Sequence, residues 1–95
     1  MKEILEKAIE HYGEAHQKLK AVEELSELIQ AILKEMDCTD LCDWQDRQNN
    51  IDEEMADVEI MLAQLRMIYQ NDKRVEKWKE RKVGMLDLSI PEEEE

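Results

Sequence analysis

The longest uninterrupted pattern in this chain is helical, and it limits what the chain can fold into. Between residues 14 and 36, apolar side chains recur every three or four positions, which is the period of an amphipathic helix rather than of a strand. The stretch contains no glycine or proline. It therefore predicts one long helix with a broad apolar side. That side is formed by Leu19, Val22, Leu25, Ile29, Ile32, Leu33 and Met36.

Three more helices are expected from the same kind of pattern. A short one over residues 2–12 ends before Gly13. A third begins near Ile51, where Asn50 and Glu53 have the form of a capping box, and runs to about residue 70. A fourth covers residues 73–83 and stops at Gly84. With two glycines and one proline in 95 residues, the composition also favours long helices with short connections.

The expected fold is therefore all-α, a helical bundle of about four helices. Residues 1–84 form one domain, and residues 85–95 form an acidic C-terminal tail whose composition favours flexibility. A chain this short buries only a modest fraction of its surface, so we expect homo-oligomerisation to complete the bundle, as a homodimer or a homotetramer. A second apolar strip on the third helix is a candidate for that subunit contact. The strip comprises Ala56, Ile60, Ala63 and Met67.

Charge and cysteine content exclude several classes of partner. The formal net charge of −12 disfavours binding to nucleic acid polymers and to anionic membranes. No apolar stretch approaches the roughly 20 residues that span a bilayer, and the N-terminus lacks a secretion signal, so the expected location is cytoplasmic. Cys38 and Cys42 have no second cysteine pair at zinc-binding spacing, which favours reduced thiols over a zinc site.

Two carboxylates of the third helix occupy positions where apolar side chains are expected. Projected at about 100° per residue, Glu54 falls inside the apolar arc of that helix and Asp57 lies on the edge of the arc. An unpaired carboxylate is costly to bury. The pattern predicts that something cationic meets these two acids.

The second helix carries a pair of acids with the same three-residue spacing. Glu24 and Glu27 lie at the margin of its apolar side. If the second and third helices pack antiparallel, both pairs converge, and four carboxylates at one point repel each other unless divalent cations lie among them. Mg²⁺ fits such an oxygen-rich site, and Mn²⁺ is an alternative. The competing interpretation is a solvated face whose acids pair with Lys20, with Lys34 or with a neighbouring chain.

The sequence around these acids resembles a known family. Val22-Glu23-Glu24-Leu25-Ser26-Glu27-Leu28 and Asp52-Glu53-Glu54-Met55-Ala56-Asp57-Val58 look like the E-x-x-E and E-x-x-D motifs of the MazG-like nucleoside triphosphate pyrophosphohydrolases. The resemblance covers roughly residues 12–70. It implies a Mg²⁺-dependent enzyme that hydrolyses a nucleoside triphosphate, canonical or modified, to the monophosphate and pyrophosphate. The implied cellular role is house-cleaning of the nucleotide pool.

The resemblance also implies roles for individual residues. Glu24, Glu27, Glu54 and Asp57 would ligate the metal, and Glu23 or Glu27 would act as general base. Polar residues before the first motif often contact the nucleobase in this family, which makes Gln17 a candidate substrate contact. Basic residues after the second motif hold phosphates, and the candidates here are Lys73, Arg74 and Lys77.

Two other functions stay open at this point. The same superfamily includes phosphoribosyl-ATP pyrophosphohydrolases, so that substrate is the nearest alternative within the enzyme class. From a different class, the chain could be a noncatalytic acidic helical module that dimerises and binds a basic partner. Stabilisation by Mg²⁺ with a nonhydrolysable nucleotide separates the last possibility from the enzymatic ones.

Overall fold

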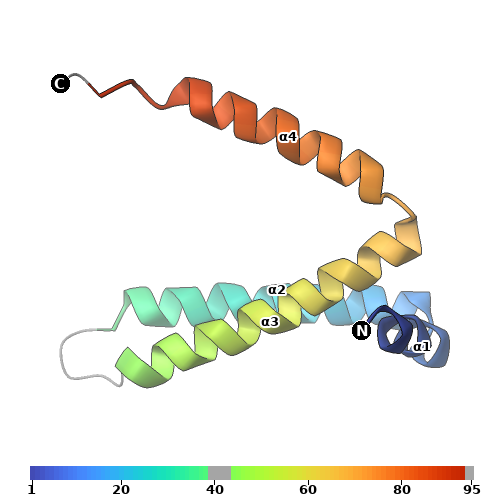
Figure 1. Cartoon of the computed structure of the whole chain (residues 1–95). Helices are drawn as coiled ribbons and strands as arrows, with labels where there is room; N and C mark the ends of the chain where they lie inside the picture. Colours follow the sequence, from blue (N-terminus) through green and yellow to red (C-terminus); the bar gives the residue numbers. More distant parts are fainter. Residues whose placement is uncertain (39–43, 94–95) are drawn as a thin grey trace.

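The regular structure of this protein is entirely helical over the residues that the computed structural model describes, 1–38 and 44–93 (Figure 1). There are four helices in this part of the chain: α1 (Lys2–Tyr12), α2 (Glu14–Met36), α3 (Trp44–Tyr69) and α4 (Asp72–Ser89). The expected all-α class is confirmed, and α1 and α2 have the predicted bounds. None of the helices in the described part of the chain combines the length and the apolar character that a bilayer span requires.

Two left-handed backbone positions separate consecutive helices. Gly13 has a φ of 89°, a conformation that costs glycine nothing and strains residues with a Cβ atom, and it turns the chain between α1 and α2. Gln70 has a φ of 50° and ends α3, directly before Asn71 and the start of α4. The predicted breaks near residues 13 and 71 are therefore confirmed.

Two predicted helix ends are wrong. Helix α3 begins at Trp44, so Asn50 lies inside the helix and does not cap it. Helix α4 continues through Gly84 to Ser89. Glycine in a helix interior costs only about 1 kcal/mol relative to alanine, so it ends a helix only where the chain turns away, and here it does not. Residues 85–89, expected to belong to a flexible tail, are helical.

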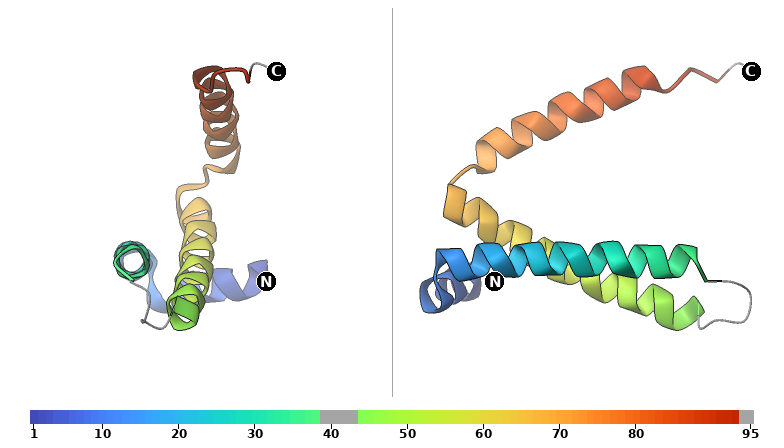
Figure 2. Two further views of the ribbon diagram at one scale, coloured as in Figure 1. Left: turned by 90° about the vertical axis from the view of Figure 1, so that its left-hand side faces the viewer. Right: turned by 180° about the vertical axis from the view of Figure 1, so that it is seen from behind.

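Helices α2 and α3 form the centre of the structure. They run antiparallel side by side, α1 packs across one end of the pair, and α4 leaves the end of α3 and projects away from α2 (Figures 1 and 2). The radius of gyration is 17.4 Å, against about 12 Å expected for a compact domain of this length. The chain therefore does not close a four-helix bundle by itself.

The side of α2 that faces α3 is not its most apolar side. The buried apolar residues are Ala21 and Ala31 of α2 and Val58 and Met61 of α3. Small alanines let the two helix backbones approach closely, which leaves the larger side chains of α2 outside the contact. The seven residues of its broad apolar side are 41–71% exposed. We call these seven side chains the apolar stripe: Leu19, Val22, Leu25, Ile29, Ile32, Leu33 and Met36.

The second apolar strip of α3 is partly covered within the chain. Ala63 and Met67 are half-buried, and Met67 lines a hollow beside Ile9 where α1 packs on α3. Ala56 and Ile60 are exposed. One half of the strip thus already has an intramolecular partner.

Candidate acidic site between α2 and α3

The antiparallel pairing of α2 and α3 brings acids from both sequence motifs together. One carboxylate oxygen from each of Glu24, Glu27 and Glu54 lies within 4.8 Å of the others. We call these three residues the acid cluster. The convergence follows from register, because Gln17 pairs with Gln64 across the same two helices, and counting inward from that pair places residue 27 opposite residue 54.

Glu24 is the most deeply buried member of the acid cluster. It is 7% exposed, and its Oε1 lies 3.2 Å from the Nζ of Lys20, one turn earlier on α2. Its Oε2 is buried and has no hydrogen-bond partner among the described residues. A buried carboxylate oxygen without a partner carries a desolvation cost, so this atom is available to a ligand that brings positive charge.

Glu54 is the member of the acid cluster on α3 and is half-buried. Burial raises the pKa of its carboxyl group, and the negative charges of Asp57 and Glu24 raise it further, while a hydrogen bond with Glu27 acts in the opposite direction. Its Oε2 is also buried without a hydrogen-bond partner in the described part of the chain. The ionised form of Glu54 is therefore destabilised by its surroundings, as expected where acids gather without enough positive charge.

The other two acids predicted to act here lie outside the acid cluster. Asp57 is half-buried one turn after Glu54, close enough to influence its pKa. The side chain of Glu23 is 56% exposed and lies 3.6 Å from the Nζ of Lys20, and it contributes no oxygen to the acid cluster. Of the two general-base candidates, only Glu27 is at the site.

The donor set of the acid cluster suits a hard divalent cation. Carboxylate oxygens bound to one Mg²⁺ at about 2.1 Å lie roughly 3–4 Å apart, and the oxygens of the cluster lie within 4.8 Å of each other. The competing interpretation agrees with the structure in one respect, because Lys20 pairs with Glu24. Glu24 is only 7% exposed, however, and therefore does not lie on a solvated face.

Gln17, predicted to contact the nucleobase, is 5% exposed and occupied by protein partners. Its Nε2 donates a hydrogen bond of 2.8 Å to Oε1 of Gln64, and its Oε1 lies 2.7 Å from Nδ1 of His16. Gln64 is 3% exposed and was not singled out from the sequence. A glutamine at a core-facing position of a helix could have indicated this pair, since a buried amide needs a polar partner on the facing helix.

The basic residues predicted to hold phosphates are not beside the acid cluster. Lys73 and Arg74 lie in the first turn and a half of α4 and line an open hollow of about 670 Å³ together with Lys2 and Arg66. Lys77 follows one turn later, beside Trp78. Tyr69 lies fifteen positions after Glu54 on α3, about 22 Å along the helix, so the acids and these cations occupy different parts of the chain.

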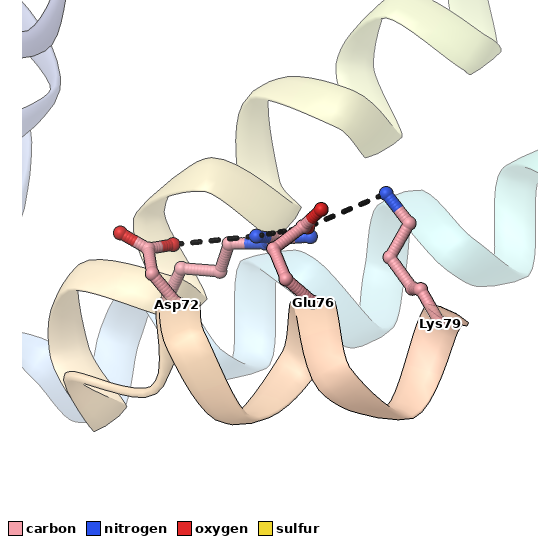
Figure 3. A network of polar contacts seen from close by, with 4 residues as sticks. Asp72, Glu76 and Lys79 are labelled. Atoms are coloured by element: carbon pink, nitrogen blue, oxygen red, sulfur yellow. Dashed lines mark hydrogen bonds and ion pairs between the residues drawn. The ribbon is translucent and has the colours of Figure 1, made fainter. Parts of the chain in front are cut away.

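Part of the charge at the start of α4 is neutralised locally. Arg66 of α3 lies 2.9 Å from Glu76 and 3.4 Å from Asp72, and Lys79 lies 3.4 Å from the same glutamate (Figure 3). Arg66 and Lys79 hold the pKa of Glu76 below its usual value. The network includes Arg66, which the sequence pattern did not indicate.

The cysteine prediction is only partly within the described residues. Cys38 is disulfide-bonded, so a reduced thiol is the wrong expectation for that residue. Cys42 lies outside the described residues.

Comparison with known proteins identifies no relative of this chain. No protein-family model, no curated protein and no solved structure matches the chain.

Proposed function

We propose that this chain is a Mg²⁺-dependent hydrolase that converts a nucleoside triphosphate to the monophosphate and pyrophosphate, as its resemblance to the MazG-like enzymes implies. One observation carries the proposal. Acids from two motifs about 30 residues apart in sequence meet across the α2–α3 contact, and on each side one buried oxygen has no hydrogen-bond partner within residues 1–38 and 44–93. Acidic motifs that serve only as solvated surface would not be expected to meet between two helices, because burying unpaired carboxylates costs free energy.

The acids have two roles in this proposal, and Glu27 takes part in both. Glu24, Glu27, Glu54 and Asp57 hold Mg²⁺, with Mn²⁺ as a substitute. When bound, the metal supplies positive charge against the triphosphate and lowers the pKa of a coordinated water. Glu27 accepts the proton of the attacking water, because Glu27 belongs to the acid cluster and Glu23 does not. A bond forms between the water oxygen and the α-phosphorus, the α–β anhydride breaks, and pyrophosphate leaves.

The test is a panel of natural and modified nucleoside triphosphates, with phosphoribosyl-ATP included, assayed for pyrophosphate release with and without Mg²⁺. We expect release from at least one member. Glu54→Gln should lower the rate by about 100-fold or more, since it removes a metal ligand. Glu53→Gln is the matched control: the neighbouring side chain is exposed, and its loss should change the rate by less than about threefold. Absence of release from every substrate, or equal rates for the two variants, contradicts the proposal.

The noncatalytic acidic module remains a second candidate because of one contact. Lys20 already lies 3.2 Å from Glu24, so the most buried acid has a cation without any metal. Thermal unfolding with Mg²⁺ and a nonhydrolysable triphosphate separates the two functions. A ligand that binds the native state raises the melting temperature, by an amount that grows with ligand concentration, whereas an interaction module should show no change.

A further inference from the structure

We propose that a hollow between the end of α3 and the start of α4 binds a small organic acid that has an apolar body, a carboxylate and one hydrogen-bond donor. We call this site the α3–α4 hollow. Its apolar part is lined by Leu62, Tyr69 and Val75, and its polar part by Arg66, Asn71 and Lys79. The site is independent of the proposed hydrolase activity, because the described residues that line it include no member of the acid cluster.

The α3–α4 hollow has the size and the walls of a small-molecule site. Its volume is about 510 Å³, and such sites typically measure about 300–1,000 Å³, with mostly apolar walls and a few polar groups. Leu62 is 45% exposed and Tyr69 is 51% exposed, so a ligand has open apolar surface to cover. The larger basic hollow described above carries Lys73 and Arg74 in place of these apolar side chains. An apolar body therefore suits the α3–α4 hollow better than a bare anion does.

The cations of the hollow favour a negatively charged group on the ligand. The chain has 25 acids against 13 lysines and arginines, yet the described residues that line this hollow include Arg66 and Lys79 and no acid. Lys18 of α2 adds positive charge nearby, because its Nζ lies 4.6 Å from the centre of the Tyr69 ring. An anionic ligand is therefore attracted more strongly than a neutral one.

Arg66 still has donors for that negative group. Both of its ion pairs in the described part of the chain, with Asp72 and Glu76, are made by Nη1. A guanidinium carries further N–H donors on Nε and Nη2, and this edge can bind both oxygens of a carboxylate. Glu76 also pairs with Lys79, so it competes with the ligand for both cations (Figure 3). Removal of the Glu76 charge should therefore strengthen binding.

Asn71 provides the contact for the donor group of the ligand. Its side-chain Oδ1 is buried and has no hydrogen-bond partner among the described residues. The residue stands directly before α4, but its side chain does not make the capping hydrogen bond that asparagine often makes at this position. A buried carbonyl oxygen without a partner is costly, and an N–H or O–H group of a bound ligand would satisfy it.

The test is a titration of the full chain with indole-3-propionate, followed through the backbone amide signals in NMR spectra, without Mg²⁺ or nucleotide. This probe combines an apolar ring, a carboxylate and an N–H donor. We expect a dissociation constant of about 1 mM or below, with the largest shifts at Tyr69, Asn71 and Val75. Indole-3-propionamide lacks the charge and inorganic phosphate lacks the apolar body, so each should bind at least about tenfold more weakly.

Two sets of variants locate the site. Val75→Trp fills the hollow and should abolish binding, whereas Val83→Trp places the same ring at an exposed position of α4 outside the hollow and should leave the affinity unchanged. Lys79→Met removes a cation and should weaken binding about threefold, and Glu76→Gln removes the competing carboxylate and should strengthen binding by about the same factor. Lys82→Met is the control, an exposed lysine of α4 outside the hollow.

Other outcomes overturn the proposal. Absence of shifts at the solubility limit of the probe would mean that the hollow holds no such ligand, and shifts centred on the apolar stripe would place the binding elsewhere. Equal affinity for the amide would show that Arg66 and Lys79 do not select an anion, and equal affinity for phosphate would show that the apolar walls contribute nothing. If Val75→Trp does not fold, the opposite effects of Lys79→Met and Glu76→Gln still decide.

Discussion

The α2–α3 pair and helix α4 are built from similar residues but differ in how much of each is buried. Both contain long helices with charged and apolar side chains, but the α2–α3 pair buries seven residues, three of them polar, and α4 buries none. The polar residues of the pair are buried because small alanines bring two helices together around them. Composition alone does not distinguish these regions, because burial depends on which helix has a neighbour.

The contrast also separates the charges of the molecule. The acid cluster lies where two helices bring carboxylates together, and among the described residues the buried Oε2 atoms of Glu24 and Glu54 have no hydrogen-bond partner. At the start of α4, Arg66, Glu76 and Lys79 satisfy one another in solvent. An added cation would therefore be stabilised more at the acid cluster than at the ion pairs of α4.

The most direct test of this difference in burial is the same substitution in both regions. Met61 is 6% exposed between α2 and α3, and Met85 is 63% exposed on α4. Met61→Ala should lower the free energy of unfolding by about 2–4 kcal/mol, because it leaves a cavity in a small core. Met85→Ala should change it by less than about 0.5 kcal/mol. Urea denaturation at one protein concentration measures both, and equal losses would mean that α4 is packed in solution.

A smaller effect is expected from the buried amide pair. Gln17→Leu leaves the amide of Gln64 buried without its partner and should cost about 1–3 kcal/mol of unfolding free energy. The double variant Gln17→Leu/Gln64→Leu removes both polar groups and should recover most of that loss. Gln45→Leu, at an exposed position of α3, is the control. A double variant as unstable as the single one would show that the pair is not the cause.

The smallest effect concerns pH and has opposite signs in the two regions. The raised pKa of Glu54 means that its contribution to stability is complete below the unfolded pKa and is lost as pH rises through the folded pKa. In EDTA at pH 7, Glu54→Gln should therefore raise the melting temperature, by on the order of 1–2 °C, with the difference fading toward pH 4.

Glu76 provides the opposite case on α4. Its pKa is lowered, so its contribution is present above the unfolded pKa and is lost as pH falls through the folded pKa. Glu76→Gln should slightly lower the melting temperature at neutral pH and have no effect in acid, the effect being small because the ion pairs are exposed. If Glu54→Gln and Glu76→Gln shifted the melting temperature in the same direction at neutral pH, the proposed difference between the two carboxylates would be wrong.

The sequence by itself determined the all-α class, the bounds of α1 and α2, and the three-residue spacing of the acids. These depend on local rules: the 3.6-residue period, the freedom of glycine at a positive φ, and the direction of side chains from one helix. The acids of both motifs were also identifiable, because Glu54 occupies a position where an apolar residue is expected.

Only the tertiary structure decided which side of each helix meets which neighbour. The register of α2 against α3 buried Gln17 and Gln64, left Asp57 outside the acid cluster and exposed the apolar stripe, and the turn at Gln70 directed the basic residues of α4 away from the acids. Period and propensity fix a helix but leave its rotation free. Rotation is set by close packing between elements distant in sequence, which no local pattern encodes.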